Sequence, residues 1–441
     1  MNARLLLALA ALTVGLAACD RALLEEIPPD LAVVSPDIGE VQLSRDVTLR
    51  VSAEALSGVE RVRIGGVDAA FDPTDDLWEA DLFLSQGTNP ILLEAFSADG
   101  STTQDTAFVV FAPLTVASPA AAILPEPRAG LTATRLNGGG VLLAGGTSTS
   151  GNVVRTAHVL FENTFVFAVG EPITMQRPRT GHTATALFDG RVLLLGGTST
   201  PTASPGAFVE EPEIIDPATQ TSRRVIVRGA PIQRSGHVTT LLDLGERQFL
   251  YVSSGQAPGS GRLLTPGTVE IAEFREGTEA DTLVTLTPSG GATGGAVLPD
   301  PTQVVVGTGI REVTAIISGL TSSASEARRV LYSSPGQLYP FAIDRVDLPS
   351  PVTPRTAADG SRLAGELALL AGGLGPSGET LASIEVYSDA ARRWVAFPPS
   401  VALGTPRREH AVTLAPSGRI LVIGGRGPNG QPLATLDVLS F

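Results

Sequence analysis

One motif recurs along the C-terminal part of the chain, and this repetition limits the possible folds more than any other feature. Five copies begin with Pro-Arg or Gln-Arg, and in each an apolar run ending in glycine follows about fifteen residues later. A degraded copy lies between the third and the last two. The copies recur at intervals of about 50 to 65 residues, which is typical of repeat units that stack on one another. They begin at Pro127, Pro178, Gln233, Gly290, Pro354 and Pro406.

The repeats predict a closed ring. A single four-stranded blade cannot bury both of its faces, whereas blades arranged around an axis bury each other. The last copy ends at Phe441 after only three strands. Upstream of the first copy, the segment LTVASPAAAILPEPRAG from Leu114 parallels WVAFPPSVALGTPRREH from Trp394. We therefore expect residues 114–118 to supply the missing outer strand of the last blade and to close a ring of six blades.

Each copy also carries a third strand, as in EIIDPATQTSRR and IEVYSDAARRW. The whole unit resembles the kelch repeat, in which the second strand ends in Gly-Gly and later strands carry a tyrosine and a tryptophan. The fifth copy matches best, with Tyr387 and Trp394 at the expected places, and the other copies lack the tryptophan. The chain thus resembles a diverged kelch-repeat (galactose oxidase-type) β-propeller over residues 113–441.

Residues 30–112 predict a second, smaller all-β domain. Short runs with apolar residues at every second position are separated by turn signals such as Gly65-Gly66 and Asp99-Gly100. About seven strands fit this length, the size of an immunoglobulin-like sandwich. The segment GTNPILLEAFSADGSTT from Gly87 resembles the Ig-like modules of bacterial surface proteins. The expected fold class is therefore all-β, an N-terminal Ig-like β-sandwich followed by a six-bladed kelch-type β-propeller.

The N-terminus predicts secretion and lipidation. A run of apolar or small residues from Leu5 to Leu16 is too short to span a bilayer and is typical of a signal peptide. It ends in Leu-Ala-Ala-Cys, which resembles the cleavage site of bacterial lipoproteins. The resemblance implies a signal peptide over 1–18, a diacylglycerol on Cys19 and a lipidated tether over 19–29. An ordinary signal peptide followed by a chance cysteine is the alternative.

Composition excludes several classes of function. The formal net charge is −14, so nucleic acid is an improbable partner. Cys19 is the only cysteine, which leaves the mature fold without disulfides or thiolate metal sites. The copper site of galactose oxidase-like enzymes needs a tyrosine cross-linked to a cysteine, so that activity is not expected. The acidic stretch Asp72–Asp76 is either a calcium loop or, equally well, a hairpin tip.

Two sets of side chains recur at fixed positions of the repeat. The three histidines could in principle form a metal site around the channel, but blade-to-blade hydrogen bonds are the favoured interpretation. The arginines also fit structural bonds, with a ligand-binding face as the alternative. We expect no metal or other cofactor and no catalytic residue. The histidines are His182, His237 and His410, and the arginines of the possible ligand face are Arg128, Arg179, Arg234, Arg355 and Arg407.

Two glycine patterns match a dinucleotide-binding fingerprint, Gly373-x-Gly375-x-x-Gly378 and its counterpart from Gly425. Neither precedes an expected helix, and both follow the Gly-Gly pair at the same place in the repeat. They are interpreted as turn glycines between strands.

The sequence favours a non-catalytic binding module over an enzyme. Long loops are expected after the second strands, over Thr198–Glu213, Gln256–Gly267 and Gly309–Arg329, on the face where ligands of propellers would bind. We predict a lipid-anchored protein of the bacterial cell envelope (outer membrane, cell surface or periplasmic face of the inner membrane) whose propeller binds an envelope protein or polymer. The alternative is an extracytoplasmic sugar-modifying enzyme such as a kelch-type epimerase. An arginine and a carboxylate clustered at the channel mouth would favour that alternative.

Overall fold

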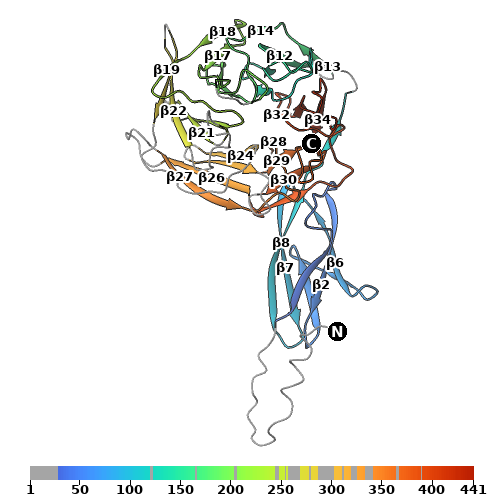
Figure 1. Ribbon diagram of the computed structural model, residues 1–441. Coiled ribbons are helices and arrows are strands. Elements are labelled where there is room, and N and C mark those ends of the chain that lie inside the picture. Colours follow the sequence, from blue (N-terminus) through green and yellow to red (C-terminus); the bar gives the residue numbers. More distant parts are fainter. Residues whose placement is uncertain are drawn as a thin grey trace, which may run out of the picture. The chain divides into compact units, whose positions relative to one another are not determined.

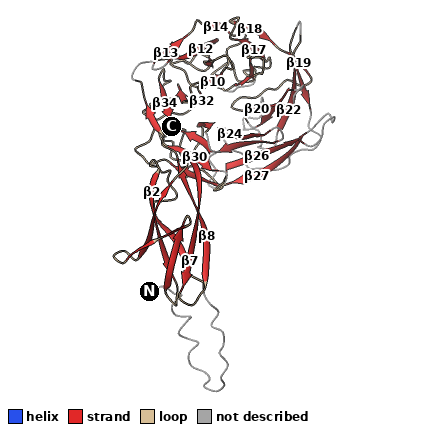
Figure 2. Cartoon of the chain, turned by 180° about the vertical axis from the view of Figure 1, so that it is seen from behind, coloured by secondary structure: helices blue, strands red, loops and turns tan. Residues whose placement is uncertain are grey.

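The computed structural model contains only β-structure among the residues that it describes (Figure 2). The predicted signal peptide, Cys19, most of the tether, the first part of the degraded copy from Gly290 and most of the loop expected over 256–267 lie outside the described residues. The prediction of a long loop over Gly309–Arg329 is wrong, because the run ending in Gly309 is the first strand of its blade and the strands Glu312–Ser318 and Ser325–Tyr332 follow it. The described residues are 28–119, 123–163, 166–202, 206–243, 248–253, 255–256, 269–277, 280–286, 302–309, 312–318, 325–332, 341–363, 367–388 and 390–441.

The N-terminal strands form two four-stranded sheets, ordered β1-β2-β6-β5 and β4-β3-β7-β8. The alternation expected around Leu49 and Val51 is present, because both are buried while their neighbours are more exposed. The acidic stretch lies at the turn between β5 and β6, where Arg50 pairs with Asp75 at 2.7 Å. The strands are β1 (Asp30–Ser35), β2 (Asp46–Glu54), β3 (Val59–Ile64), β4 (Val67–Asp68), β5 (Ala70–Asp72), β6 (Leu77–Phe83), β7 (Gly87–Ser97) and β8 (Thr102–Phe111).

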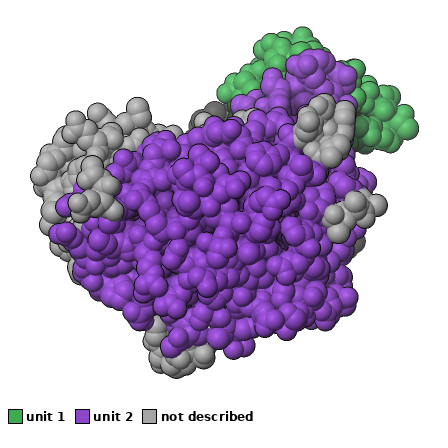
Figure 3. All heavy atoms as spheres, turned by 90° about the horizontal axis from the view of Figure 1, so that it is seen from above, with its two compact units in different colours: residues 1–35, 48–81, 91–107 green, residues 36–47, 82–90, 108–441 purple. Residues whose placement is uncertain are grey.

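The chain divides into two compact units that interleave in the sequence (Figure 3). One comprises residues 1–35, 48–81 and 91–107, and the other comprises 36–47, 82–90 and 108–441. The short early segments belong to the second unit because they contact the strands of the fifth blade. For example, the backbone N–H of Val41 donates to the carbonyl of Ala396 at 2.9 Å. The Ig-like assignment and a boundary at residue 112 stay predictions.

Six further sheets form the predicted six-bladed propeller (Figure 1). The first strands of successive sheets lie side by side, β10 with β15, β15 with β20, β24 with β28, β28 with β32 and β32 with β10. Blade 1 contains β10 (Thr132–Arg135), β11 (Val141–Ala144), β12 (Thr156–Asn163), β13 (Val166–Val169) and β14 (Ile173–Thr174). Blade 2 contains β15 (Thr183–Ala186), β16 (Val192–Leu195), β17 (Glu213–Asp216) and β18 (Thr221–Arg224). Blade 3 contains β20 (Val238–Asp243), β21 (Gln248–Ser253), β22 (Val269–Arg275) and β23 (Thr282–Leu286), with β19 (Ile226–Arg228) parallel to β23.

The remaining blades complete the ring. Blade 4 contains β24 (Thr302–Gly309), β25 (Glu312–Ser318), β26 (Ser325–Tyr332) and β27 (Phe341–Leu348). Blade 5 contains β28 (Asp359–Arg362), β29 (Leu367–Ala371), β30 (Ile384–Ser388) and β31 (Arg393–Ala396). Blade 6 contains β32 (Ala411–Leu414), β33 (Ile420–Ile423), β34 (Leu436–Ser440) and, from the start of the propeller segment, β9 (Thr115–Ala117).

The predicted closure of the ring is confirmed. Strand β9 pairs antiparallel with β34, so that Val116 lies opposite Leu439 and Thr115 opposite Ser440. The fourth blade differs from the expected register. There the apolar run that ends in Gly309 forms the first strand of the blade, whereas in the other copies this run forms the second strand.

The Gly-Gly pairs are required by the contact between neighbouring blades. At Gly372 (φ 58°), a Cβ atom would lie 2.5 Å from the carbonyl oxygen of Arg407 in the next blade. At Gly196 (φ 63°), a Cβ would overlap the carbonyl oxygen of Arg234 in the same way. Because only glycine has neither a Cβ atom nor the penalty for positive φ, blades 1, 2, 5 and 6 all keep this pair.

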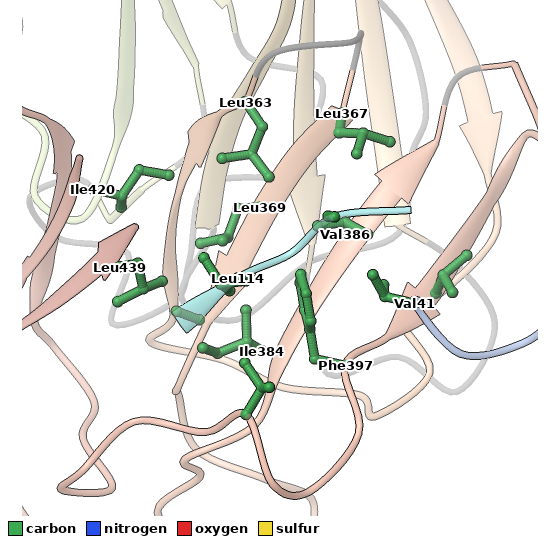
Figure 4. Packing of buried hydrophobic residues seen from close by; sticks show 14 of the residues in the cluster. Val41, Leu114, Leu363, Leu367, Leu369, Ile384, Val386, Phe397, Ile420 and Leu439 are labelled. Carbon is green, nitrogen blue, oxygen red and sulfur yellow. The ribbon is translucent and has the colours of Figure 1, made fainter. Parts of the chain in front are cut away.

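The blades pack through apolar clusters. Figure 4 shows one, in which Leu369 and Val386 of blade 5 lie with Ile420 and Leu439 of blade 6. The kelch-type aromatic pair lies in the same blade, with the rings of Tyr387 and Trp394 5.5 Å apart between centroids. The glycines of the two dinucleotide-like patterns lie in the connections β29–β30 and β33–β34, so their interpretation as turn glycines is confirmed.

Candidate functional site at the propeller channel

The repeated arginines lie inside their blades. The most exposed of the five, Arg234, has a relative exposure of only 3%. In four blades the guanidinium donates to the carbonyl of the first glycine of the Gly-Gly pair; from Arg179 Nη1 to Gly196 O the distance is 2.9 Å. The same bond is made by Arg128, Arg355 and Arg407.

Three of these arginines pair with a buried acid on the third strand. The distance from Arg179 to Glu213 is 2.7 Å and from Arg407 to Asp437 2.8 Å, and Arg355 pairs with Glu385 in the same way. All six side chains have exposures of 0 or 1%. The third strand of blade 1 carries His158 at this position instead, and Arg128 pairs with the partly exposed Glu126 at 3.1 Å.

The burial of all five arginines bears on the two interpretations of this set. The guanidinium groups of Arg355 and Arg407, for example, join the second and third strands of their blades through carbonyl and carboxylate acceptors. Buried charges of this kind are kept where they are paired and hydrogen-bonded. The geometry therefore favours blade-stabilising bonds over contacts with a ligand.

Two of the three repeated histidines connect neighbouring blades. His182 Nε2 lies 3.1 Å from the hydroxyl of Thr132 in the preceding blade, and His237 Nε2 lies 3.1 Å from that of Thr183. Burial, reinforced by nearby arginines, lowers the pKa of His237 and of His410 to about 3. Burial also lowers the pKa of His182 well below its usual value. The three imidazoles are therefore neutral at physiological pH.

A belt of backbone hydrogen bonds surrounds one end of the channel. The residue before each of these histidines, or its equivalent in blades 1 and 5, has positive φ. In blades 1, 2, 3 and 6 this residue donates its N–H to the carbonyl of its counterpart in a neighbouring blade. Three of these residues are glycines, but Ala357 (φ 50°) and Glu409 (φ 53°) are not. Non-glycine residues at positive φ are strained and are often found at functional sites.

The belt encloses a cavity of about 450 Å³ on the propeller axis. Its described walls come from the first strands of blades 1, 2, 3, 5 and 6 and the residues just before them. This volume lies within the range of about 300 to 1,000 Å³ that is usual for small-molecule sites. The walls present threonine and serine hydroxyls, the three histidines and two acids. Those acids are Asp359 and Glu409.

Asp359 is the most perturbed acid of the channel. Burial raises its pKa to about 7, although two backbone N–H groups oppose the shift. The N–H of Gly360 donates to its Oδ1 at 2.8 Å, and the N–H of Val412 in blade 6 donates to its Oδ2 at 2.7 Å. A carboxyl group that titrates near neutral pH can hold or release a proton, which is a common property of functional sites.

At the channel mouth a carboxylate and two arginines lie together. Arg426 Nε donates to Glu409 Oε2 at 2.7 Å, and Arg408 Nε lies 3.8 Å from Glu409 Oε1. These side chains are between 23 and 39% exposed, so they are open to a ligand from solvent. An arginine and a carboxylate together at the channel mouth favour the alternative of a sugar-modifying enzyme.

Sequence reasoning selected the repeated arginines and histidines and missed Asp359 and Glu409. The signal that identifies these two acids is a departure from the repeat. Asp359 stands where blades 1 and 2 have Thr132 and Thr183, and Glu409 stands where three other blades have glycine.

Two searches of the described residues gave negative results. The described residues contain no group of three or more histidine, cysteine, aspartate or glutamate side chains that could hold a metal ion. Nor does that part of the chain contain a helix long and apolar enough to cross a membrane.

No protein-family model and no curated protein matches the chain. Among solved structures it is similar to one titled "Structure of YjhT", with 14% identity and a TM-score of 0.49, over 70% of this chain and 95% of that one. It is also similar to a fungal alcohol oxidase of the AA5 family in complex with copper, with 13% identity and a TM-score of 0.41. That match covers 94% of this chain and 74% of the oxidase. Likenesses at this level carry no conclusion about activity, substrate or metal.

Proposed function

We propose that this protein is a non-catalytic, lipid-anchored component of a bacterial cell envelope that binds a protein or surface polymer through one face of its propeller. The observation that carries the proposal is a set of isolated bridges around the channel mouth. Each bridge joins the segment before a first strand to the start of a loop after a second strand. The bridges are Ala129–Thr147, Thr180–Thr198, Ser235–Gln256, Thr356–Leu374 and Arg408–Arg426.

These bridges gather the loops of five blades around one opening, which we call the mouth face. Its described loop residues are 147–153, 198–202, 206–209, 374–380 and 426–432. They are rich in serine, threonine, glycine and asparagine and poor in aromatic residues. Such a surface offers many hydrogen-bonding groups from several loops, which suits a broad polar partner better than a stacked ligand. The conspicuous repeated arginines, by contrast, are taken up by the blade interiors.

Site-specific photo-crosslinking tests the mouth face. A photoreactive residue placed at Asn152 or Asn429, both exposed on that face, is expected to form an adduct with one envelope component in cells. Matched positions are Thr219 and Ser417, which are exposed in hairpins at the opposite ends of the strands. Adducts of equal yield from both faces, or none from the mouth face, would overturn the proposal.

The lipid anchor has its own test. Cells expressing the full chain are labelled with a radioactive fatty acid, and the protein is expected to carry the label. Cys19→Ser should abolish labelling and release the protein from the membrane fraction. Equal labelling of the two proteins would show that Cys19 is not the attachment point.

A sugar-modifying enzyme, such as an epimerase, is the second candidate, because the Glu409 carboxylate and the Arg426 guanidinium meet at the channel mouth. Exchange spectroscopy by NMR measures the interconversion of sugar anomers in the presence of the protein. Acceleration that is lost in both Glu409→Gln and Arg426→Gln would support this candidate. Unchanged rates across a panel of neutral and acidic sugars would remove it.

A further inference from the structure

One seam of the channel wall differs in chemistry from two others. Where blades 1 and 2 meet, the hydroxyl of Thr132 bonds to His182, and the next seam repeats this bond between Thr183 and His237. At the seam between blades 5 and 6, the same two repeat positions hold Asp359 and His410. At this seam the carboxyl group of Asp359 therefore replaces the threonine hydroxyl, while the histidine of the next blade is kept.

The two groups at this third seam are not satisfied by each other. Among the described residues, the oxygens of Asp359 accept only the backbone N–H groups of Gly360 and Val412. Neither ring nitrogen of His410 has a hydrogen bond of good geometry within the described residues, although the carbonyls of Ala371 and Arg407 lie near. Because a carboxylate accepts about four hydrogen bonds and Asp359 receives the two from Gly360 and Val412, acceptor capacity is left over at this seam.

The described part of the surrounding wall supplies no positive charge to match. Among the described lining residues there is no lysine or arginine, and the three histidines are neutral. No described cation forms an ion pair with Asp359, whereas Glu409 is already paired with Arg426. The first strand of blade 4, TQVVVGTG, also contains no basic residue. The cavity is thus rich in acceptors and poor in fixed cations, which disfavours an anionic ligand.

We propose that the channel is a binding site for a small organic ammonium compound, with Asp359 as counter-charge. The cavity of about 450 Å³ has the volume for such a ligand, and the threonine and serine hydroxyls of its wall would bind accompanying hydroxyl groups. A bare metal ion fits less well, because no three potential ligands are grouped in the described residues. This site does not depend on the proposed partner of the mouth face.

Three polyols that differ at one carbon test the proposal by isothermal titration calorimetry on the full-length protein in detergent. They are 1-amino-1-deoxyglucitol, glucitol and gluconate, which carry an ammonium group, a hydroxyl group and a carboxylate. We expect the amine to bind about tenfold or more tightly than glucitol, since charge-assisted bonds to a carboxylate are the stronger ones. Gluconate should not bind measurably.

The pH dependence adds a second readout. The alkylamine stays protonated between pH 6 and 8, whereas Asp359, whose pKa is about 7, changes from mostly neutral to mostly ionised. Affinity for the amine should therefore rise by about tenfold over this interval. Affinity for glucitol should not follow the same curve.

Variants locate the effect. Asp359→Asn, and Asp359→Thr, which restores the residue of blades 1 and 2, should both abolish the preference for the amine and its pH dependence. The exposed Asp46→Asn removes the same net charge elsewhere and should change neither. An equal affinity for all three polyols, a preference that survives in both Asp359 variants, or no binding of the amine would each overturn the proposal.

Discussion

The blade interiors and the channel wall use the same repeat in opposite ways. In the interior, blades 2, 5 and 6 each hold an arginine against an acid on the third strand, with both side chains excluded from solvent. In the channel wall, the position that is threonine in blades 1 and 2 is Asp359 in blade 5 and Ala411 in blade 6. In these three blades the strand-joining positions thus keep the same chemistry, whereas the positions that face the axis vary. The variation points to the channel, more than to the repeated charges, as the place where this chain differs from a generic propeller.

The interior should be the more sensitive of the two regions. Glu385 accepts the N–H groups of Val352 and Thr353 as well as the guanidinium of Arg355. Glu385→Gln removes the charge and leaves a buried arginine unpaired, so we expect a loss of about 3 to 5 kcal/mol in the free energy of unfolding. Denaturant titration followed by circular dichroism measures it.

A double variant tests whether this loss arises from the unpaired charge. Arg355→Met combined with Glu385→Met should recover part of the stability lost in Glu385→Gln, since apolar pairs often replace buried ion pairs at little cost. A Glu385→Gln protein as stable as the parent would show that the interior arginines are not held by their acids, and the contrast between the two regions would disappear.

In the channel wall, Asp359 should make stability depend on pH. Its folded pKa of about 7 is above the ordinary value of 3.8, so the folded state holds a proton that the unfolded state releases. The associated stability is fully present below about pH 4 and is lost as pH rises toward 7. The loss is at most about 4 kcal/mol and is reduced because Asp359 partly faces the channel.

The buried histidines act in the opposite direction over part of this range. Their folded pKa values lie below 6.5, so the unfolded state takes up protons first and stability falls as pH decreases from about 6.5. Asp359→Asn removes the compensation that Asp359 provides and should steepen this loss. Thermal melts between pH 4 and 8 compare the variant with the parent, and parallel curves would contradict the raised pKa of Asp359.

A smaller effect is expected at a seam that keeps its threonine. Thr183→Val retains the shape of the side chain but leaves His237 Nε2 without its bond at 3.1 Å and also breaks the bond to Thr239 at 2.8 Å. We expect a loss of about 1 to 2 kcal/mol in unfolding free energy, the usual cost of an unsatisfied buried polar group. The same change at the exposed Thr106 is the control and should cost almost nothing.

Sequence reasoning predicted the architecture better than the site. The six copies and the parallel between Leu114 and Trp394 predicted the blades and the closing strand, because ring closure needs a fourth strand for the last blade. The prediction for the fourth blade was wrong by one strand, because the run that ends in Gly309 forms the first strand and not the second. This copy lacks the arginine and the Gly-Gly pair that mark the second strand in other copies. The recurrence of the arginines could be read from the sequence. Their burial could not, because it depends on packing against partners about 30 residues away.

Asp359 was missed for a physical reason of the same kind. One aspartate in a weakly matching copy has no distinguishing feature until the ring places it beside His410 and inside a channel lined by five blades. Only the alignment of copies, position by position, could have marked it as a departure from threonine.

The smallest predicted effect lies in blade 1, where the buried arginine has a different partner from the arginines of blades 2, 5 and 6. There His158 takes the place of the third-strand acid, and Arg128 is paired with Glu126, whose side chain is 44% exposed. A partly exposed ion pair is worth about 0 to 1 kcal/mol, so Glu126→Gln should reduce the unfolding free energy far less than Glu385→Gln does. His158→Glu would supply the acid that blades 2, 5 and 6 have at this position, and in that background Glu126→Gln should cost nothing measurable. Denaturant titrations of the two single variants and the double variant measure the coupling. If Glu126→Gln alone is as damaging as Glu385→Gln, a solvent-exposed carboxylate suffices to hold the buried arginine, and the third-strand acids are not what makes the interior uniform.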